Sequence, residues 1–277
     1  MCTCLAIDIG NSGLRISTLD FEHDRVGEPM RISWGHAEQL SPGKFAADGP
    51  HWLNEIEKFL GEQVESNAAL LWVVSSVRRD ALTVLENFVA RRVTDRLHVI
   101  SYRDVPLIAN VQSPTRLGID RLLAALAASN RTTCRPLLVI QAGSAVTVDL
   151  VSRNSLQQDV FEGGAILPGV PMMLRLLGQA ADMLPEIEAD DLTDLPCLPG
   201  KNTEAAMTCG AASALVGGVQ HLVGRYRAAF GEQLPVILSG GDGMRLATFI
   251  SAPLFVEPHL VQLGVFMVAQ AIAHTSE

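Results

Sequence analysis

Two short glycine-containing turns hold side chains whose types and spacing could do chemistry. The first follows a strand-like run and reads DIGNSG, from Asp8 to Gly13. Its two glycines permit backbone with positive φ, so that successive N–H groups can approach a ligand, and its asparagine and serine add side-chain donors. Asp8, at the strand end, could hold Mg²⁺ directly or through water. The turn fits a cradle for phosphate, with a plain hairpin turn as the alternative.

The second turn lies within the stretch LLVIQAGSAVTVDLV, from Leu137 to Val151. Gly143, Ser144 and Thr147 repeat the glycine and hydroxyl groups of the first turn, so the same phosphate chemistry is possible here.

The two turns also resemble each other in sequence. When Ala6–Ile16 is laid over Val139–Asp149, an isoleucine and a glycine coincide, and Asp8 meets Gln141. Two similar hairpins indicate two similar lobes, with chance agreement as the alternative.

A carboxylate and a guanidinium stand side by side in the segment Gly118-Ile119-Asp120-Arg121. Apolar residues recur at i, i+3, i+4 and i+7 from Ile119, which predicts a helix that begins here. Asp120 could accept a hydroxyl proton while Arg121 grips an anionic substrate. The alternative is a helix cap with a salt-bridging arginine.

Three other segments have a structural and a functional interpretation. GGAILPG, from Gly163 to Gly169, is a glycine-rich strand end and turn that could also close over a ligand. SGGDG, from Ser239 to Gly243, lacks side chains where a nucleotide base could lie against backbone. Asn202-Thr203-Glu204 is typical of a helix N-cap.

The composition excludes several function classes. The 277 residues are 48% hydrophobic and 18% charged, which predicts a folded chain of one large domain or two lobes. A net charge of −9 and a pI near 5.3 give no general attraction for nucleic acid or anionic lipid, so neither is expected as a partner. The seven histidines show no paired metal-ligand spacing.

Cysteines and apolar runs favour a cytoplasmic protein. Five cysteines at irregular spacing predict a reducing compartment, and Cys2-x-Cys4 is interpreted as strand thiols in preference to half a metal site. No signal peptide is recognised. The uncharged runs Ala205–Gly224 and Pro258–Ser276 carry glutamine and histidine, which favours close-packed core helices over membrane spans.

The elements that must position these residues alternate between strand and helix. We expect strands at Leu5–Ile9, Leu14–Leu19, Ala68–Val77 and Leu97–Ser101, helices at Asn54–Val64 and Leu82–Val93, and an exposed loop at Asp190–Pro199. The order indicates a mixed α/β protein with hairpins.

Taken in order, the motifs DIGNS, GIDR, QAGSAVTVD, GGAILPG, NTEAA and LSGGDG resemble those of the type III pantothenate kinases, from Ala6 to about Val265. That family belongs to the acetate and sugar kinase/Hsp70/actin superfamily. The resemblance implies an α/β fold of two ribonuclease-H-like lobes with ATP in a cleft between them, divided here as 1–115 and 116–277. It also implies a homodimer and ATP-dependent phosphorylation of pantothenate, the first step of coenzyme A synthesis.

The resemblance assigns roles by position. Asp120 would be the base for the substrate hydroxyl, and Asp8 would serve Mg²⁺. The ATP-binding residues would be Asp8, Ile9, Gly10, Asn11, Ser12, Gly13, Leu14, Arg15 and Ser144. The pantothenate-binding residues would be Gly118, Ile119, Asp120, Arg121 and Thr203, with Thr203 acting from the other protomer or lobe.

Two positions depart from the family pattern. Gln141 stands where the family has an Asp that binds a monovalent cation, K⁺ or NH₄⁺, and Val111 stands where the family often has a Tyr that lines the pantothenate pocket. Gln141 could coordinate the cation through its amide oxygen, replace the cation with its own NH₂ donor, or mark a decayed site. We favour replacement, because Asp8, Asp120, Arg121 and Asp149 all remain. The alternative functions are a non-catalytic nucleotide-binding or regulatory homologue, and a kinase for another small hydroxylated acid.

Overall fold

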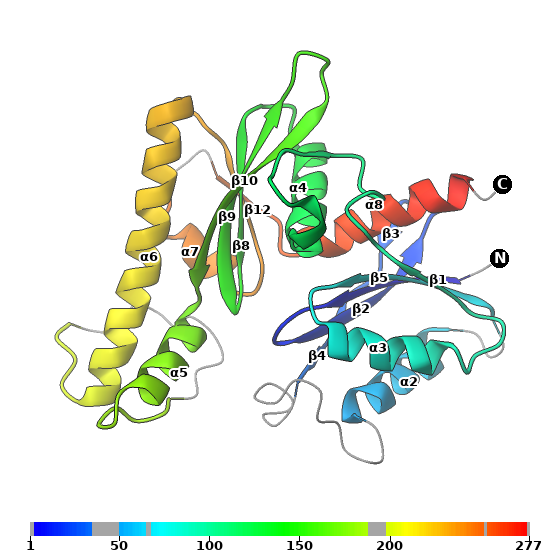
Figure 1. Cartoon of the computed structure of the whole chain (residues 1–277), viewed down its shortest axis with the longest axis horizontal. Coiled ribbons are helices and arrows are strands. Elements are labelled where there is room, and N and C mark those ends of the chain that lie inside the picture. The colour runs from blue at the N-terminus through cyan, green and yellow to red at the C-terminus, as the bar shows by residue number, and fades with distance from the viewer. Residues whose placement is uncertain (1–2, 35–49, 65–67, 188–197, 252–253, 276–277) are drawn as a thin grey trace. The chain divides into compact units, whose positions relative to one another are not determined.

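The computed structural model describes residues 3–34, 50–64, 68–187, 198–251 and 254–275. They form two compact units that interleave along the chain (Figure 1). Unit 1 comprises Met1–Pro106, Thr115–Ala127 and Val261–Glu277, and unit 2 comprises Leu107–Pro114 and Ala128–Leu260. The division into lobes at residues 115 and 116 stays a prediction.

Unit 1 is built on a six-stranded mixed sheet of order β3-β2-β1-β5-β6, with β4 paired to β2. Its strands are β1 (Thr3–Ile9), β2 (Gly13–Asp20), β3 (Arg25–Val26), β4 (Met30–Ser33), β5 (Leu70–Ser76) and β6 (Arg96–Val99). Its helices are α2 (His51–Gln63), α3 (Arg79–Val89), and parts of α4 (Ile119–Arg131) and α8 (Leu260–Thr275). The helices α2 and α3 cover one face of the sheet.

The alternation of β1 decides which face receives Asp8. Leu5, Ile7 and Ile9 point into the apolar core beneath α2 and α3, which also holds Trp34 and Trp52. Because successive strand residues face opposite sides, Asp8 points to the other face of the sheet.

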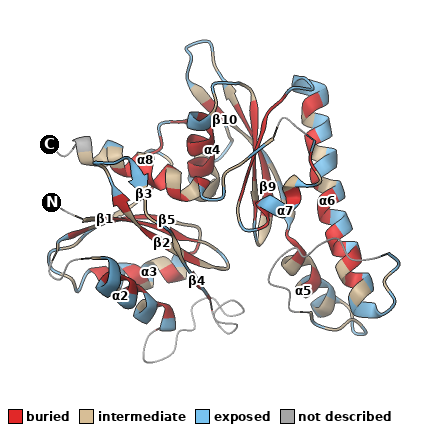
Figure 2. Ribbon diagram, turned by 180° about the vertical axis from the view of Figure 1, so that it is seen from behind, coloured by how far each residue is buried: buried red, intermediate tan, exposed pale blue. Residues whose placement is uncertain are grey.

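Unit 2 has a second six-stranded sheet, of order β12-β11-β8-β9-β10-β7. Its strands are β7 (Ile108–Ala109), β8 (Leu137–Ala142), β9 (Ala145–Arg153), β10 (Asp159–Pro168), β11 (Val236–Ser239) and β12 (Leu254–Val256). Its helices are α5 (Val170–Ala180), α6 (Thr203–Phe230) and α7 (Gly243–Ala247); a 3₁₀ turn, Pro114–Arg116, joins the units. Figure 2 shows the central strands and one side of α6 as buried.

The two sheets repeat one topology, as the paired hairpins predicted. In unit 1 the order β2-β1-β5-β6 joins an antiparallel hairpin to two parallel strands, and β9-β8-β11-β12 does the same in unit 2. The hairpins differ in length, because Ile9 pairs with Leu14 whereas Ala142 pairs with Val146. The second turn is therefore one residue shorter.

The expected elements occur with shifted ends. Helix α3 begins three residues before the expected Leu82, with Asp80 in its first turn, where a carboxylate complements the helix dipole. Helix α6 is long and apolar enough to cross a membrane, but 44% of its most apolar window is buried inside the protein, and residues such as Leu215 and Val219 join the core of unit 2. This matches the expected core helix. The predicted loop Asp190–Pro199 lies almost entirely outside the described residues.

Candidate functional site

The first predicted turn is a tight connection between β1 and β2. Gly10 donates its N–H to the carbonyl of Gly13 at 2.9 Å. A Cβ on Gly13 would overlap the carbonyl oxygen of Ile32 and lie 3.0 Å from Ser33 Cα, so only glycine permits β4 to approach at this point. Asn11 is exposed, while Ser12 is partly buried.

Asp8 is a buried carboxylate with three polar neighbours. Its side chain accepts a hydrogen bond from Ser75 Oγ at 3.2 Å and lies 3.7 Å from Arg15 Nη1, and the whole residue is 5% exposed. Burial raises the pKa of Asp8 to about 6; Arg15 and Ser75 lower it, and the nearby charge of Asp120 raises it. The repulsion between the two carboxylates favours the protonated form of Asp8.

Asp120 lies in the first turn of α4, as the apolar spacing predicted. Its Oδ1 accepts a hydrogen bond from the backbone N–H of Arg121 at 2.9 Å. A Cβ on Gly118 would lie 2.7 Å from that oxygen, so Gly118 leaves the room that the carboxylate occupies. The structure thus brings Asp120 within electrostatic range of Asp8 in unit 1, which makes a general base beside a phosphate loop chemically possible.

The second turn is held by the start of α5. Gly169, the N-cap of α5, donates its N–H to the carbonyl of Ser144 at 2.9 Å. A Cβ on Gly169 would overlap the carbonyl oxygen of Gly143 and lie 2.8 Å from that of Ser144. The GGAILPG segment therefore does more than connect a strand to a helix, because its last glycine supports the turn that carries Ser144.

Gln141 lies on β8 opposite Thr147 of β9 and beside Ser239 of β11. The amide oxygen of Gln141 and the hydroxyl of Thr147 are both buried without a hydrogen-bond partner in the described part of the chain. Two uncharged oxygens are weak ligands for a cation. Rotation of the Gln141 amide would place its NH₂ group, a hydrogen-bond donor, in the same position.

Asp149 is fully buried on β9. Gly164, which pairs with it on β10, leaves its carboxylate room, because a Cβ at that position would overlap Asp149 Oδ1. Val111 lies against β10. Its Cγ1 atom is 3.6 Å from the position that a Cβ would take on Gly163, a residue with φ of +86°.

Thr203 is the first residue of α6 and is exposed. Asn202 is the N-cap, and its side chain accepts a hydrogen bond from the N–H of Ala205 at 2.7 Å. The capping interpretation of this segment is confirmed, and the pantothenate role of Thr203 stays a prediction.

The SGGDG segment packs against the end of β8. Gly240 has φ of +91°, and a Cβ there would overlap the carbonyl oxygen of Ala142. Asp242 is buried, 3.7 Å from Arg245 Nη1. Gly240 is thus required by close packing, and a nucleotide role for this segment stays a prediction.

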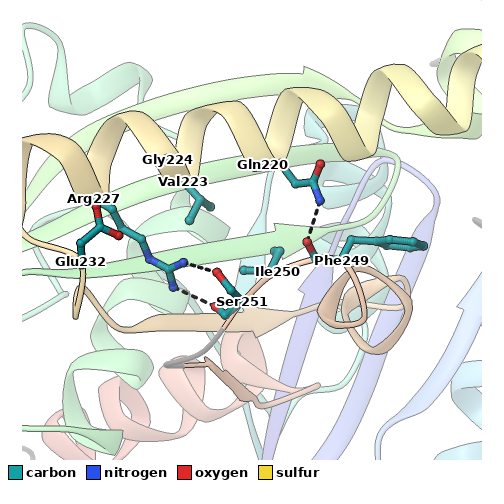
Figure 3. Close-up of a pocket in the computed structure, with 8 residues that line it drawn as sticks. All are labelled: Gln220, Val223, Gly224, Arg227, Glu232, Phe249, Ile250 and Ser251. Atoms are coloured by element: carbon teal, nitrogen blue, oxygen red, sulfur yellow. Dashed lines mark hydrogen bonds between the residues drawn. The ribbon is translucent and has the colours of Figure 1, made fainter.

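A pocket of about 410 Å³ lies elsewhere in unit 2, between α6 and the segment before β12 (Figure 3). Arg227 donates to Ser251 Oγ at 2.7 Å and to Ser251 O at 2.9 Å, and Gln220 donates to Phe249 O at 2.8 Å. These bonds tie the helix to the segment. None of the predicted site residues lines this pocket.

Candidate metal donors are few. Within the described ranges no group of three or more His, Cys, Asp or Glu side chains could hold a metal ion. Cys4 is buried, and Cys2 lies outside the described residues. Asp8 fits Mg²⁺ only in the manner typical of ATP sites, where one or two carboxylates share the ion with phosphate and water.

Ser75 and Trp34, two neighbours of the first turn, are not predicted by the sequence patterns. Ser75 lies within an apolar run, and only the parallel register of β5 with β1 sets it opposite Asp8. Trp34 follows β4, and its indole Nε1 donates to the carbonyl of Gly10 at 2.9 Å. The alternation of β5 could have indicated which residues share a face with Ser75, whereas no local signal identifies Trp34.

Known proteins with similar sequences share one description. Residues 4–225 match the family model of the type III pantothenate kinases. A type III pantothenate kinase of Rhodopirellula baltica is 30% identical over 273 residues, covering 93% of this chain and 95% of the relative. One of Cupriavidus pinatubonensis is 32% identical over 279 residues, covering 96% and 98%.

Solved structures share this fold and confirm the predicted fold class, an α/β protein with two mixed sheets. A Sinorhizobium meliloti protein described as a 2-dehydro-3-deoxygalactonokinase has a TM-score of 0.58 at 13% identity, covering 97% of this chain and 98% of its own. A Campylobacter jejuni protein described as a Baf family transcriptional activator has a TM-score of 0.55 at 18% identity, covering 98% and 99%. By its sequence matches, this chain belongs to the type III pantothenate kinase family.

Proposed function

We propose that this chain transfers the γ-phosphoryl group of ATP to the hydroxyl of pantothenate and so begins coenzyme A synthesis. The observation that carries the proposal is the placement of Asp120, in the first turn of α4, within electrostatic range of Asp8 beside the glycine turn of unit 1. Phosphoryl transfer needs positioning and neutralised charge more than covalent help, so such a site suffices.

In the proposed reaction Asp120 accepts the proton of the pantothenate hydroxyl. The hydroxyl oxygen then bonds to the γ-phosphorus as the bond to the β–γ bridging oxygen breaks, and ADP leaves. Bound Mg²⁺ would neutralise phosphate charge, and Asp8 would hold it with the phosphates and water. Arg121 would grip the pantothenate carboxylate as a fixed cation.

The remaining assignments follow the family positions. The turn from Asp8 to Arg15 would contact ATP phosphates in unit 1, and Ser144 would contact phosphate from unit 2. Thr203 would contact pantothenate. A homodimer and a cytoplasmic location belong to the same proposal.

We assign Gln141 the role of a built-in substitute for the monovalent cation. Its amide is uncharged and so is the hydroxyl of Thr147 opposite, a set that supports a fixed hydrogen-bonding group better than an ion site. Coordination of K⁺ by the amide oxygen and loss of the site's function are the competing outcomes.

A kinase for another small hydroxylated acid is the second candidate. It is favoured by Val111, which packs near Gly163 and offers no hydroxyl where the family often has a tyrosine. A non-catalytic nucleotide-binding or regulatory homologue is the third.

Product identification separates these candidates. Purified protein with Mg²⁺ and ATP would be offered pantothenate and, in parallel, other small hydroxylated acids, and the products read by mass spectrometry. We expect one added phosphoryl group on pantothenate and far less on the other acids. Preferential phosphorylation of another acid would reassign the substrate, and nucleotide binding with no product from any acid would support the non-catalytic homologue.

A further inference from the structure

Trp34 contacts the first glycine turn through two hydrogen bonds. Its indole Nε1 donates to Gly10 O at 2.9 Å, and its backbone N–H donates to Ser12 O at 3.1 Å. The β2–β4 register explains this position. Gly13 pairs with Ser33, the last residue of β4, so Trp34, the next residue, lies opposite Ser12. Trp34 is 3% exposed, so it is almost entirely buried.

The two bonds fix the direction of the turn's peptide units. In a planar trans peptide the C=O of one residue and the N–H of the next point in opposite directions. Because the carbonyls of Gly10 and Ser12 point at Trp34, the N–H groups of Asn11 and Gly13 point away from it. Each bond therefore leaves one backbone donor turned away from Trp34, and backbone N–H groups are the donors that a phosphate cradle uses.

The guanidinium of Arg78 lies over the face of the indole ring. Its guanidinium carbon lies 5.1 Å from the centre of the Trp34 ring, within the range of a cation–π contact. Asp80 fixes the guanidinium through bonds of 3.0 Å from Nε and 3.0 Å from Nη2. The backbone before Arg78 is tied to β1, since Val77 donates its N–H to Ile9 O at 3.0 Å.

We propose that Trp34, clamped by Arg78, is a positioning residue that orients the phosphate turn for ATP. The proposal rests on the proposed function for its ligand, while its structural content, an ordered turn, does not depend on the reaction. The ring also packs edge to face on Trp52, at 5.6 Å between centroids, so Trp34 joins the turn to the core beneath α2.

The test is Trp34→Phe, which keeps an aromatic ring for Arg78 and Trp52 but removes the donor to Gly10 together with part of the buried ring, a volume loss that the control must share. The matched control is Trp72→Phe. Trp72 lies in the same unit and donates from Nε1 to Asp95 Oδ2 at 2.9 Å, away from the turn, so this variant also loses one indole hydrogen bond. Arg78→Lys is the second variant, which keeps the charge and loses the planar clamp.

We expect Trp34→Phe to raise the KM for ATP about three- to tenfold, the worth of one hydrogen bond, with kcat and the KM for pantothenate little changed. Arg78→Lys should shift the same constant by less. Without nucleotide, amide hydrogen exchange in the peptide spanning Ile7–Leu14 should be faster in Trp34→Phe and unchanged in Trp72→Phe.

Unchanged exchange in Trp34→Phe, or equal acceleration in Trp72→Phe, would overturn the positioning role. Should Trp34→Phe fail to fold, the exchange rate of the same peptide in Arg78→Lys decides: acceleration supports the clamp, and wild-type exchange rejects it. A wild-type protein that phosphorylates nothing would contradict the proposed function alone, because the exchange comparison needs no catalysis.

Discussion

Burial disfavours the charged form of the Asp8 carboxylate, so the stability of the folded protein depends on whether Asp8 is ionised. The folded state holds its proton up to pH about 6, whereas the unfolded chain releases it near pH 3.8. Between these values the folded state binds more protons, so the free energy of unfolding falls as the pH rises, and the loss is complete above pH about 6. A carboxylate with a pKa perturbed in this way is a candidate for a functional site.

We therefore expect Asp8→Asn to be more stable than wild type above pH 6, by on the order of 1–3 kcal/mol, and to lose the fall in stability between pH 4 and 6. Its kinase activity should drop at least about tenfold, because Asn is a poorer Mg²⁺ ligand. Urea unfolding across pH measures the first effect, and steady-state kinetics the second.

The control for Asp8→Asn is Asp20→Asn. A hydrogen bond from His23 lowers the pKa of Asp20, so the carboxylate stabilises the fold above its unfolded pKa, and its loss should act in the opposite direction. A less stable Asp8→Asn at pH 8 would show that the carboxylate is a structural ion-pair partner of Arg15.

Gln141 tests the idea of a built-in cation substitute. We expect wild-type turnover to agree within about twofold in sodium, potassium and ammonium salts, because position 141 holds an uncharged amide where the family has a charged cation ligand. Gln141→Asp should make turnover depend on K⁺ or NH₄⁺, since a buried carboxylate needs a counter-charge. A steep rise of wild-type activity with potassium would show that Gln141 does not replace the cation, and would support coordination of the cation through the amide oxygen.

At the scale of elements, the second turn depends on the start of α5. Gly169→Ala should destabilise the protein by about 1–3 kcal/mol, because its Cβ would overlap the carbonyls of the Gly143–Ser144 turn. If Ser144 contacts phosphate, the KM for ATP should also rise. Thermal unfolding measures the loss of stability, and steady-state kinetics with varied ATP measure the change in KM.

The matched control is Gly217→Ala, inside α6 in the same unit, where a Cβ meets open space. It should be neutral or stabilising by up to about 1 kcal/mol, because alanine favours helix. A Gly169→Ala variant as stable as Gly217→Ala would show that the close contact at Gly169 relaxes without cost.

Elements with strong local patterns could be predicted, and those that depend on distant pairing could not. The helix α4 and the hairpin strands β1 and β2 follow from apolar spacing and turn residues. Ser75 and Trp34 reach the first turn only through the pairing of β5 with β1 and of β4 with β2. Strand register over such separations is set by tertiary packing, and no short stretch of sequence encodes it.

At the scale of the whole molecule, the duplicated topology explains why two turns share a sequence pattern. Asp8 and Gln141 take equivalent places, each beside a serine, Ser75 and Ser239, on the neighbouring parallel strand. The equivalence could be predicted from the paired hairpins. The interleaving of the two units along the chain could not, because residues 107–114 join unit 2 through the short pairing of β7 with β10.

The net charge of −9 makes a further prediction for the whole chain. We expect no binding to duplex DNA in a mobility-shift assay, even at low salt, because contacts to phosphate need a basic surface. A sequence-specific shift would contradict this expectation.

The central claim is that this chain phosphorylates pantothenate with Asp120 as the base. The most direct measurement is the steady-state rate of pantothenate phosphorylation by wild type, Asp120→Asn and the control Glu55→Gln, an exposed position on α2. We predict that wild type and Glu55→Gln turn over alike, while kcat of Asp120→Asn falls about 100-fold or more with unchanged thermal stability. Turnover of Asp120→Asn within a few-fold of wild type would contradict the base assignment, and an inactive wild type would contradict the kinase itself.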